Sequence, residues 1–128
     1  MSRQVRITTM LCSAALIVPG TVLLAPPAQA DTERLGSCGT GTYDFSVDRD
    51  DGRFEVELSL DGVVPNSTWK VALRHEGKRF YKQVIRVDED GDRDIVRFRG
   101  NTPGTDTFKF RAKKVTGSTV CMARIVER

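Results

Sequence analysis

Five acidic residues stand within the seven-residue segment 88–94, DEDGDRD, which comes closer to a chemical motif than any other part of the chain. A calcium loop of the EF-hand type needs oxygen ligands at positions 1, 3 and 5, glycine at 6 and glutamate at 12. If Asp88 is position 1, Arg93 and Arg99 stand where the glycine and the glutamate should be. If Gly91 is position 6, Arg86 stands at position 1 and Arg97 at position 12, and neither is an oxygen ligand. An Asp-Gly pair is also a common turn dipeptide. The segment therefore favours a turn between strands, with a weak cation site as the alternative, and we assign no metal ligand.

His75 is the only histidine in the chain. It shares its parity with Trp69, Val71 and Leu73, which places it at the end of a strand near the rim of the core. A zinc or copper site needs several His or Cys ligands. The imidazole is chemically able to act as a general base, but no GxSxG motif or Cys/His arrangement supplies a nucleophile. The sequence therefore predicts a structural histidine, no catalytic residue, no cofactor and no enzyme.

The first thirty residues have the layout of a secretory signal peptide. Arg3 and Arg6 form a basic start, an apolar stretch follows, and Ala-Gln-Ala at 28–30 is a small-x-small cleavage site. A retained membrane anchor is the alternative, because the apolar stretch approaches the roughly 20 residues that span a bilayer. We therefore predict a secreted, extracellular protein with no membrane span after processing, and association with the cell wall is left open.

Cleavage would leave residues 31–128, which are enough for one domain with one modest core. Cys12 would leave with the signal peptide, and Cys38 and Cys121 would remain. Because exported domains form in an oxidising compartment, two remaining cysteines indicate one intramolecular disulfide. The mature chain has 18 basic and 17 acidic residues, a net charge of +1, so its total charge gives no reason to expect nucleic acid as a partner.

The mature chain is dominated by apolar residues that alternate with polar ones. This pattern follows a polar, Gly-rich segment at 31–41, which we interpret as a flexible N-terminal lead. Seven segments carry the alternation, at 42–48, 53–60, 68–76, 79–87, 95–100, 107–115 and 119–127, and turn sequences separate them. A period of two predicts strands with one buried face, and no segment has helical spacing. The pattern favours an all-β antiparallel sandwich over 42–128, with a small barrel as the structural alternative.

Three local features identify a more specific resemblance. Trp69 lies in the third predicted strand, Cys38 precedes the first strand with a partner in the last, and an Asp-x-Asp-Gly turn stands at 88–91. Residues 103–125 also look like the last two strands of bacterial immunoglobulin-like domains. The layout of residues 38–127 resembles small exported bacterial proteins with a single immunoglobulin-like domain. It departs from antibody domains, whose first cysteine lies in the second strand. The resemblance implies an immunoglobulin-like β-sandwich and brings no known activity.

The charges divide along the chain, with a net −6 over residues 31–63 and +7 over residues 64–128. In an immunoglobulin-like sandwich the first two strands lie mainly in one sheet, and strands three, four, six and seven lie in the other. Outward positions of strands three and six include the candidate binding residues Lys70, Arg74, Lys109 and Arg111. We therefore predict a dipolar domain whose basic face binds an anionic cell-envelope polymer or another surface protein. The alternative is a structural exported domain without a specific ligand, in which outward charges only maintain solubility and block edge pairing.

Overall fold

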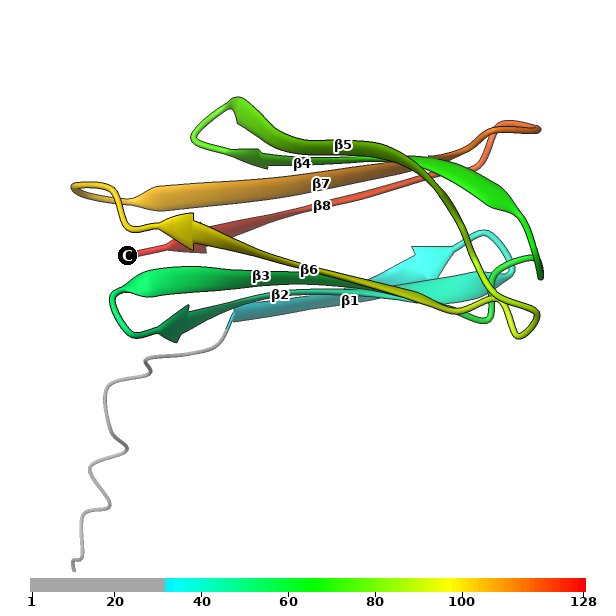
Figure 1. Cartoon of the computed structure of the whole chain (residues 1–128), viewed down its shortest axis with the longest axis horizontal. Helices are drawn as coiled ribbons and strands as arrows, with labels where there is room; N and C mark the ends of the chain where they lie inside the picture. The colour runs from blue at the N-terminus through cyan, green and yellow to red at the C-terminus, as the bar shows by residue number, and fades with distance from the viewer. Residues whose placement is uncertain (1–31) are drawn as a thin grey trace, which may run out of the picture.

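The computed structural model describes residues 32–128, which form eight antiparallel strands in two packed sheets (Figure 1). Sheet A has the order β1 (Thr32–Cys38), β2 (Gly41–Asp50), β3 (Arg53–Asp61) and β6 (Arg93–Gly100). Sheet B has the order β5 (Lys78–Arg86), β4 (Thr68–His75), β7 (Asp106–Lys114) and β8 (Val120–Glu127). The predicted all-β sandwich is confirmed, and two separate sheets replace the alternative of a small barrel. The predicted signal peptide, residues 1–30, lies outside the described residues.

The strand order is that of an immunoglobulin-like sandwich with one additional edge strand. Strands β2, β3 and β6 correspond to A, B and E of that fold, and β5, β4, β7 and β8 correspond to C′, C, F and G. The first two predicted strands therefore lie in sheet A, and the third, fourth, sixth and seventh lie in sheet B, as expected from the sequence. Within residues 32–128 there is no helix long and apolar enough to cross a membrane.

The core lies between the sheets and consists of the inward-facing alternate residues of the strands. Its largest fully buried side chains are those of Trp69, Phe45, Phe54, Phe108 and Phe110. The indole N–H of Trp69 donates to Ser67 Oγ at 2.8 Å, so the polar end of this large ring is satisfied. Phe45 meets Phe110 edge to face, with ring centroids 5.0 Å apart. Such pairs stabilise a core by about 0.5–1.5 kcal/mol beyond the area they bury.

The interpretation of residues 31–41 as a flexible lead is wrong, because Thr32–Cys38 forms β1 along the edge of β2. Side chains of this strand show no hydrophobic alternation: Leu35 faces solvent and is 69% exposed. Gly36 lies opposite Tyr43, whose ring atoms would be 2.5 Å from a Cβ at that position. The glycine is therefore a packing requirement. Backbone pairing and the neighbouring cysteine hold the strand in place, and neither leaves a periodic signal in the sequence.

Strands β5 and β6 lie at corresponding edges of the two sheets, and cation–π contacts close this side of the sandwich. The Arg97 guanidinium lies 4.6 Å from the centroid of the Tyr81 ring, and that of Arg99 lies 4.7 Å from Phe80. The pairing of β5 with β4 shifts register beside these aromatic residues. As a result, the consecutive residues Phe80 and Tyr81 both lie partly buried against the core. This irregularity explains why Phe80 and Tyr81 are both apolar, whereas Val84 is an apolar residue on the outward side of the strand.

A disulfide closes the opposite side of the sandwich, where β1 and β8 are the edge strands. Cys38 at the end of β1 is bonded to Cys121 in β8, with Cα atoms 5.4 Å apart, so the predicted pairing is confirmed. Both residues are buried. The bond joins positions 83 residues apart, and closing a loop of that length corresponds to about 4.5 kcal/mol in the chain-entropy model.

Replacing both cysteines, Cys38→Ser with Cys121→Ser, should give a folded domain whose free energy of unfolding is lower by about 4 kcal/mol. The unfolded chain regains the freedom that the cross-link removes, while the aromatic core is unchanged. Urea unfolding followed by the fluorescence of Trp69 measures the difference, with the oxidised and the reduced wild-type protein as controls. Equal unfolding midpoints for the oxidised protein and the variant would contradict this expectation.

Candidate functional site: two oppositely charged sheet faces

The outward side of sheet B, which we name the basic face, carries only positive charge among the described residues. Its cations, all exposed, are Lys70 and Arg74 on β4; Arg79, Lys82 and Arg86 on β5; Lys109, Arg111 and Lys113 on β7; and Arg124 on β8. Within residues 32–128, the carboxylates on these four strands are Asp106 and Glu127, and both are buried. The four binding residues predicted from the sequence therefore lie together on one face.

The registers of sheet B place like charges directly opposite one another. Arg74 pairs with Arg79 on one side and with Lys109 on the other, and Lys109 pairs with Arg124. These residues form an unbroken row of four cations across all four strands. Directly opposed side chains have Cβ atoms only about 4.5–5.5 Å apart, and like charges there destabilise the pair. Folding stability alone therefore disfavours this arrangement.

The row of cations borders a shallow hollow of about 510 Å³ on the basic face. Its lining includes Ala72, Met122, Arg74, Lys109, Arg111 and Arg124. The short side chain of Ala72 leaves this space among longer neighbours, and Met122, which is 59% exposed, adds apolar surface. The hollow therefore combines an apolar lining with cationic side chains around it.

The outward side of sheet A, which we name the acidic face, carries the opposite charge. Its carboxylates are Glu33 on β1; Asp44, Asp48 and Asp50 on β2; Glu55, Glu57 and Asp61 on β3; and Asp94 on β6. Among residues 32–128, Arg53 is the one cation at an outward position of these strands. It stacks on the Phe98 ring, 4.0 Å from the ring centroid. The charge imbalance along the chain thus becomes a dipole across the sandwich, from sheet A to sheet B.

Crowding on the acidic face changes the proton affinity of its carboxylates. A hydrogen bond with Asp44, and then repulsion by its charge, raises the pKa of Glu33. Burial, followed by repulsion from Asp92, Asp94 and Asp44, raises the pKa of Asp61. Repulsion between ionised carboxylates contributes to both shifts, although it is the largest cause of neither. A positively charged surface laid against this face would relieve the repulsion.

The acidic segment 88–94 forms the turn that carries the chain from β5 in sheet B to β6 in sheet A. Asp88 Oδ1 accepts hydrogen bonds from the backbone N–H groups of Asp90 at 2.8 Å and Asp92 at 2.9 Å. Gly91 packs so closely on the loop after β3 that a Cβ there would lie 2.0 Å from a carbonyl oxygen. The predicted turn is confirmed, but the Asp-Gly pair serves a crossing between sheets rather than a hairpin.

Carboxylate oxygens of Asp88, Asp90 and Asp92 lie within 4.8 Å of one another, a spacing that a cation could bridge. However, Asp88 already holds two backbone amides, and Asp92 Oδ1 accepts the N–H of Gly62 at 2.9 Å. These hydrogen bonds give the carboxylates a structural use, since they fix the turn against the loop after β3. We therefore keep the turn, and not a cation site, as the role of this segment.

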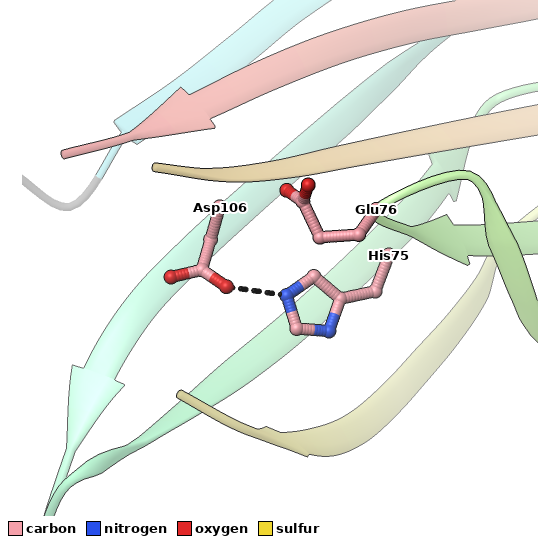
Figure 2. A group of neighbouring side chains, drawn as sticks. All are labelled: His75, Glu76 and Asp106. Carbon is pink, nitrogen blue, oxygen red and sulfur yellow. Dashed lines mark hydrogen bonds and ion pairs between the residues drawn. The ribbon is translucent and has the colours of Figure 1, made fainter. Parts of the chain in front are cut away.

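His75 is buried at one end of the core, where its imidazole binds Asp106 (Figure 2). His75 Nε2 lies 2.7 Å from Asp106 Oδ1, and the ring stacks on Phe108 with centroids 4.3 Å apart. Thr102 donates to the same carboxylate oxygen from its backbone N–H and from its hydroxyl. Burial acts to raise the pKa of Asp106, but the hydrogen bonds from Thr102 and His75 outweigh it and hold the pKa below its ordinary value.

Glu76 follows His75 in the chain and brings a second carboxylate near the same point. Ligand atoms of His75, Glu76 and Asp106 lie within 4.8 Å of one another. In Figure 2 a hydrogen bond joins only His75 and Asp106, and the Glu76 carboxylate accepts the backbone N–H of Thr107. The group therefore ties the end of β4 to the start of β7. Sequence reasoning missed Asp106, although it has the inward parity of Phe108, which was the available signal.

No family model, curated protein or solved structure matches this chain in comparisons with known proteins. The immunoglobulin-like sandwich hosts many unrelated functions, so the fold by itself selects none of them. The two charged faces are the features from which a function can be inferred.

Calcium at about 1 mM should leave the Tm unchanged, because backbone amides already occupy oxygens of the acidic turn. A specific site filled at a hundredfold excess over its Kd would add about 2.7 kcal/mol of stability. That gain would raise the Tm of a domain of this size by several degrees. Calorimetry in calcium and in magnesium chloride at equal ionic strength measures the shift. A rise with calcium that Asp90→Asn abolishes would restore the cation site.

Asp106→Asn should lower the free energy of unfolding near pH 7 by about 1–3 kcal/mol, because it weakens a buried, charge-assisted network. The pKa of Asp106 is lowered in the folded state from an unfolded value of about 3.9. Its contribution is therefore complete above that value and is lost as the pH falls through the folded pKa. Urea unfolding between about pH 2 and pH 7 should show a gap between wild type and variant that narrows in acid. Asp94→Asn, which removes an exposed carboxylate, is the matched control. A difference between wild type and Asp106→Asn that does not depend on pH would show that Asp106 is not ionised in the folded protein.

Proposed function

We propose that this chain is a secreted, non-enzymatic immunoglobulin-like module that docks through its basic face onto an anionic polymer of the cell envelope. The row formed by Arg79, Arg74, Lys109 and Arg124 supports the proposal most strongly. Opposed cations cost stability in the free protein, and a bound polyanion removes that cost by neutralising them. A surface charged only for solubility would be expected to intersperse both signs.

The composition of the basic face favours a flexible acidic polysaccharide over a single-stranded nucleic acid. Strands lie about 4.8 Å apart and alternate residues along one strand about 6.8 Å apart, so the charges form a two-dimensional grid. Among residues 32–128, no Phe, Tyr or Trp takes an outward position in sheet B, so the described face offers no ring on which bases could stack. The hollow at Ala72 offers an apolar contact for an uncharged part of the polymer.

We also propose that the chain is one of the small exported bacterial proteins with a single immunoglobulin-like domain that its sequence resembles. The strand order supports this relationship, as does the bond between Cys38 and the last strand. Such a domain needs no active site to be useful outside the cell. Its stable sandwich presents a large flat sheet, and the sheet carries the charges that meet the polymer.

A variant in which four cations of the basic face are replaced tests the docking proposal. Its substitutions are Lys70→Ser, Arg74→Ser, Lys109→Ser and Arg111→Ser. Binding to purified cell envelope and to immobilised dextran sulfate should weaken by about fourfold to several hundredfold, since each of the four exposed charge contacts contributes about 0.2–1 kcal/mol. The melting temperature should hold or rise, because the variant relieves repulsion within sheet B. Pull-down and calorimetry measure the two effects.

A second variant controls for net charge, because it also loses four exposed cations but keeps the basic face. Its substitutions are Arg34→Ser, Arg53→Ser, Arg93→Ser and Arg128→Ser. This control should bind dextran sulfate as the wild type does, and neutral dextran should bind neither protein. Equal losses in the two variants would refute a role for the basic face. Tighter binding to duplex DNA than to dextran sulfate would instead indicate nucleic acid as the partner.

A further inference from the structure

We propose that the acidic face of one copy binds the basic face of a second copy, so that the protein assembles with its sheets stacked face to face. The inference uses the same basic face as polymer docking, but it requires no polymer. The occupant is a second copy of this chain because the chain itself carries the complementary surface.

Charge complementarity supports this pairing of faces. Within residues 32–128, eight carboxylates and one cation lie on the acidic face, and nine cations lie on the basic face. Each face contains opposed like charges, such as Asp48 with Glu55 on one and Arg74 with Lys109 on the other. Stacking the two faces relieves the repulsion within both at once.

Exposed apolar side chains on both faces add a second, independent reason for contact. Leu35, Val96 and Phe98 are 69%, 36% and 45% exposed on the acidic face. On the basic face, Val84 and Met122 are 60% and 59% exposed. Stacked sheets lie about 10 Å apart with strand directions within about 30° of each other, so such side chains interdigitate. Their burial would strengthen an association that charge attraction orients.

The position of the two faces determines the form of the assembly. They lie on opposite sides of one sandwich, whose two layers are seen edge-on in Figure 1. An interface between two different surfaces is heterologous, and without a closing rotation it repeats into an open column. A four-stranded face is only about 15–20 Å wide. Its strands have eight or nine residues and are about 27–30 Å long, so the face has a projected area of roughly 400–600 Å². The contact is therefore smaller than a standard interface of about 800 Å² per partner, and the association should be weak and sensitive to salt.

Sedimentation velocity in polymer-free buffer tests the inference. At low ionic strength, near 0.01 M, the weight-average sedimentation coefficient of the wild type should rise with protein concentration, and near 1 M salt it should return to the monomer value. The basic-face variant described above should stay monomeric. A matched acidic-face variant should also stay monomeric; its substitutions are Glu33→Gln, Glu55→Gln, Glu57→Gln and Asp94→Asn.

Mixing the two variants gives the decisive result. The basic-face variant keeps an intact acidic face, and the acidic-face variant keeps an intact basic face, so the mixture should form a one-to-one dimer and stop there. Association that persists in high salt or in both variants would indicate pairing of edge strands and would overturn the inference. Trp69 fluorescence checks that each variant is folded. A variant that unfolds is replaced by a milder double substitution, which is Lys109→Ser with Arg111→Ser for the basic face and Glu57→Gln with Asp94→Asn for the acidic face.

Polymer binding separates this inference from the proposed function. The acidic-face variant should lose self-association and still bind dextran sulfate as tightly as the wild type. A wild type that stays monomeric at every concentration in low salt overturns the self-association and leaves polymer docking intact. Self-association without binding to dextran sulfate or to cell envelope would overturn polymer docking and leave the self-association intact.

Discussion

Alternation of side chains along paired strands governs both the interior and the two outer surfaces of this sandwich. The central strands send every second residue into the space between the sheets, where Trp69 and four phenylalanine rings form a close-packed interior. The residues between them must then face solvent on one of two flat surfaces. The same pleat that buries the core therefore gathers the charges of four strands on each side, and the two faces of the sandwich follow from it.

A sandwich of two open sheets has two exposed sides, and this protein closes them in chemically different ways. The disulfide between Cys38 and Cys121 joins the sheets at the β1 and β8 side. At the β5 and β6 side, Arg97 and Arg99 lie over the rings of Tyr81 and Phe80. The disulfide is covalent and stabilises the fold largely by restricting the unfolded chain. The cation–π contacts are attractions that exist in the folded state.

Polar groups inside the sandwich follow a different logic from those on its faces. Asp106 is buried, and His75 and Thr102 hydrogen-bond to its Oδ1, which holds the pKa of this carboxyl below its ordinary value. The basic face, in contrast, places cations next to one another, and no carboxylate takes an outward position in its described strands. Buried charges in this protein serve the fold, and the clustered surface charges are those available to a partner. This difference separates the structural histidine from the candidate binding surface.

Four properties could be predicted from the sequence alone: the fold class, the two sheets to which most strands belong, the disulfide and the polarity of the domain. These properties depend on local alternation, on the presence of two cysteines after the predicted cleavage site, and on a charge imbalance along the chain. Sequence reasoning also placed Lys70, Arg74, Lys109 and Arg111 outward, because parity is a local property of each strand. Their role as a binding surface stays a prediction.

Features that depend on which strands are neighbours required the three-dimensional structure. It showed β1, whose side chains carry no periodic signal because backbone pairing and Gly36 beneath Tyr43 hold the strand. It also placed Asp106 against His75 and aligned Arg79, Arg74, Lys109 and Arg124 in one row. Parity states whether a residue points inward or outward, but it contains no information about register between distant strands. Register is set by the packing of the whole sandwich, and for that reason the row of cations could not be read from the sequence.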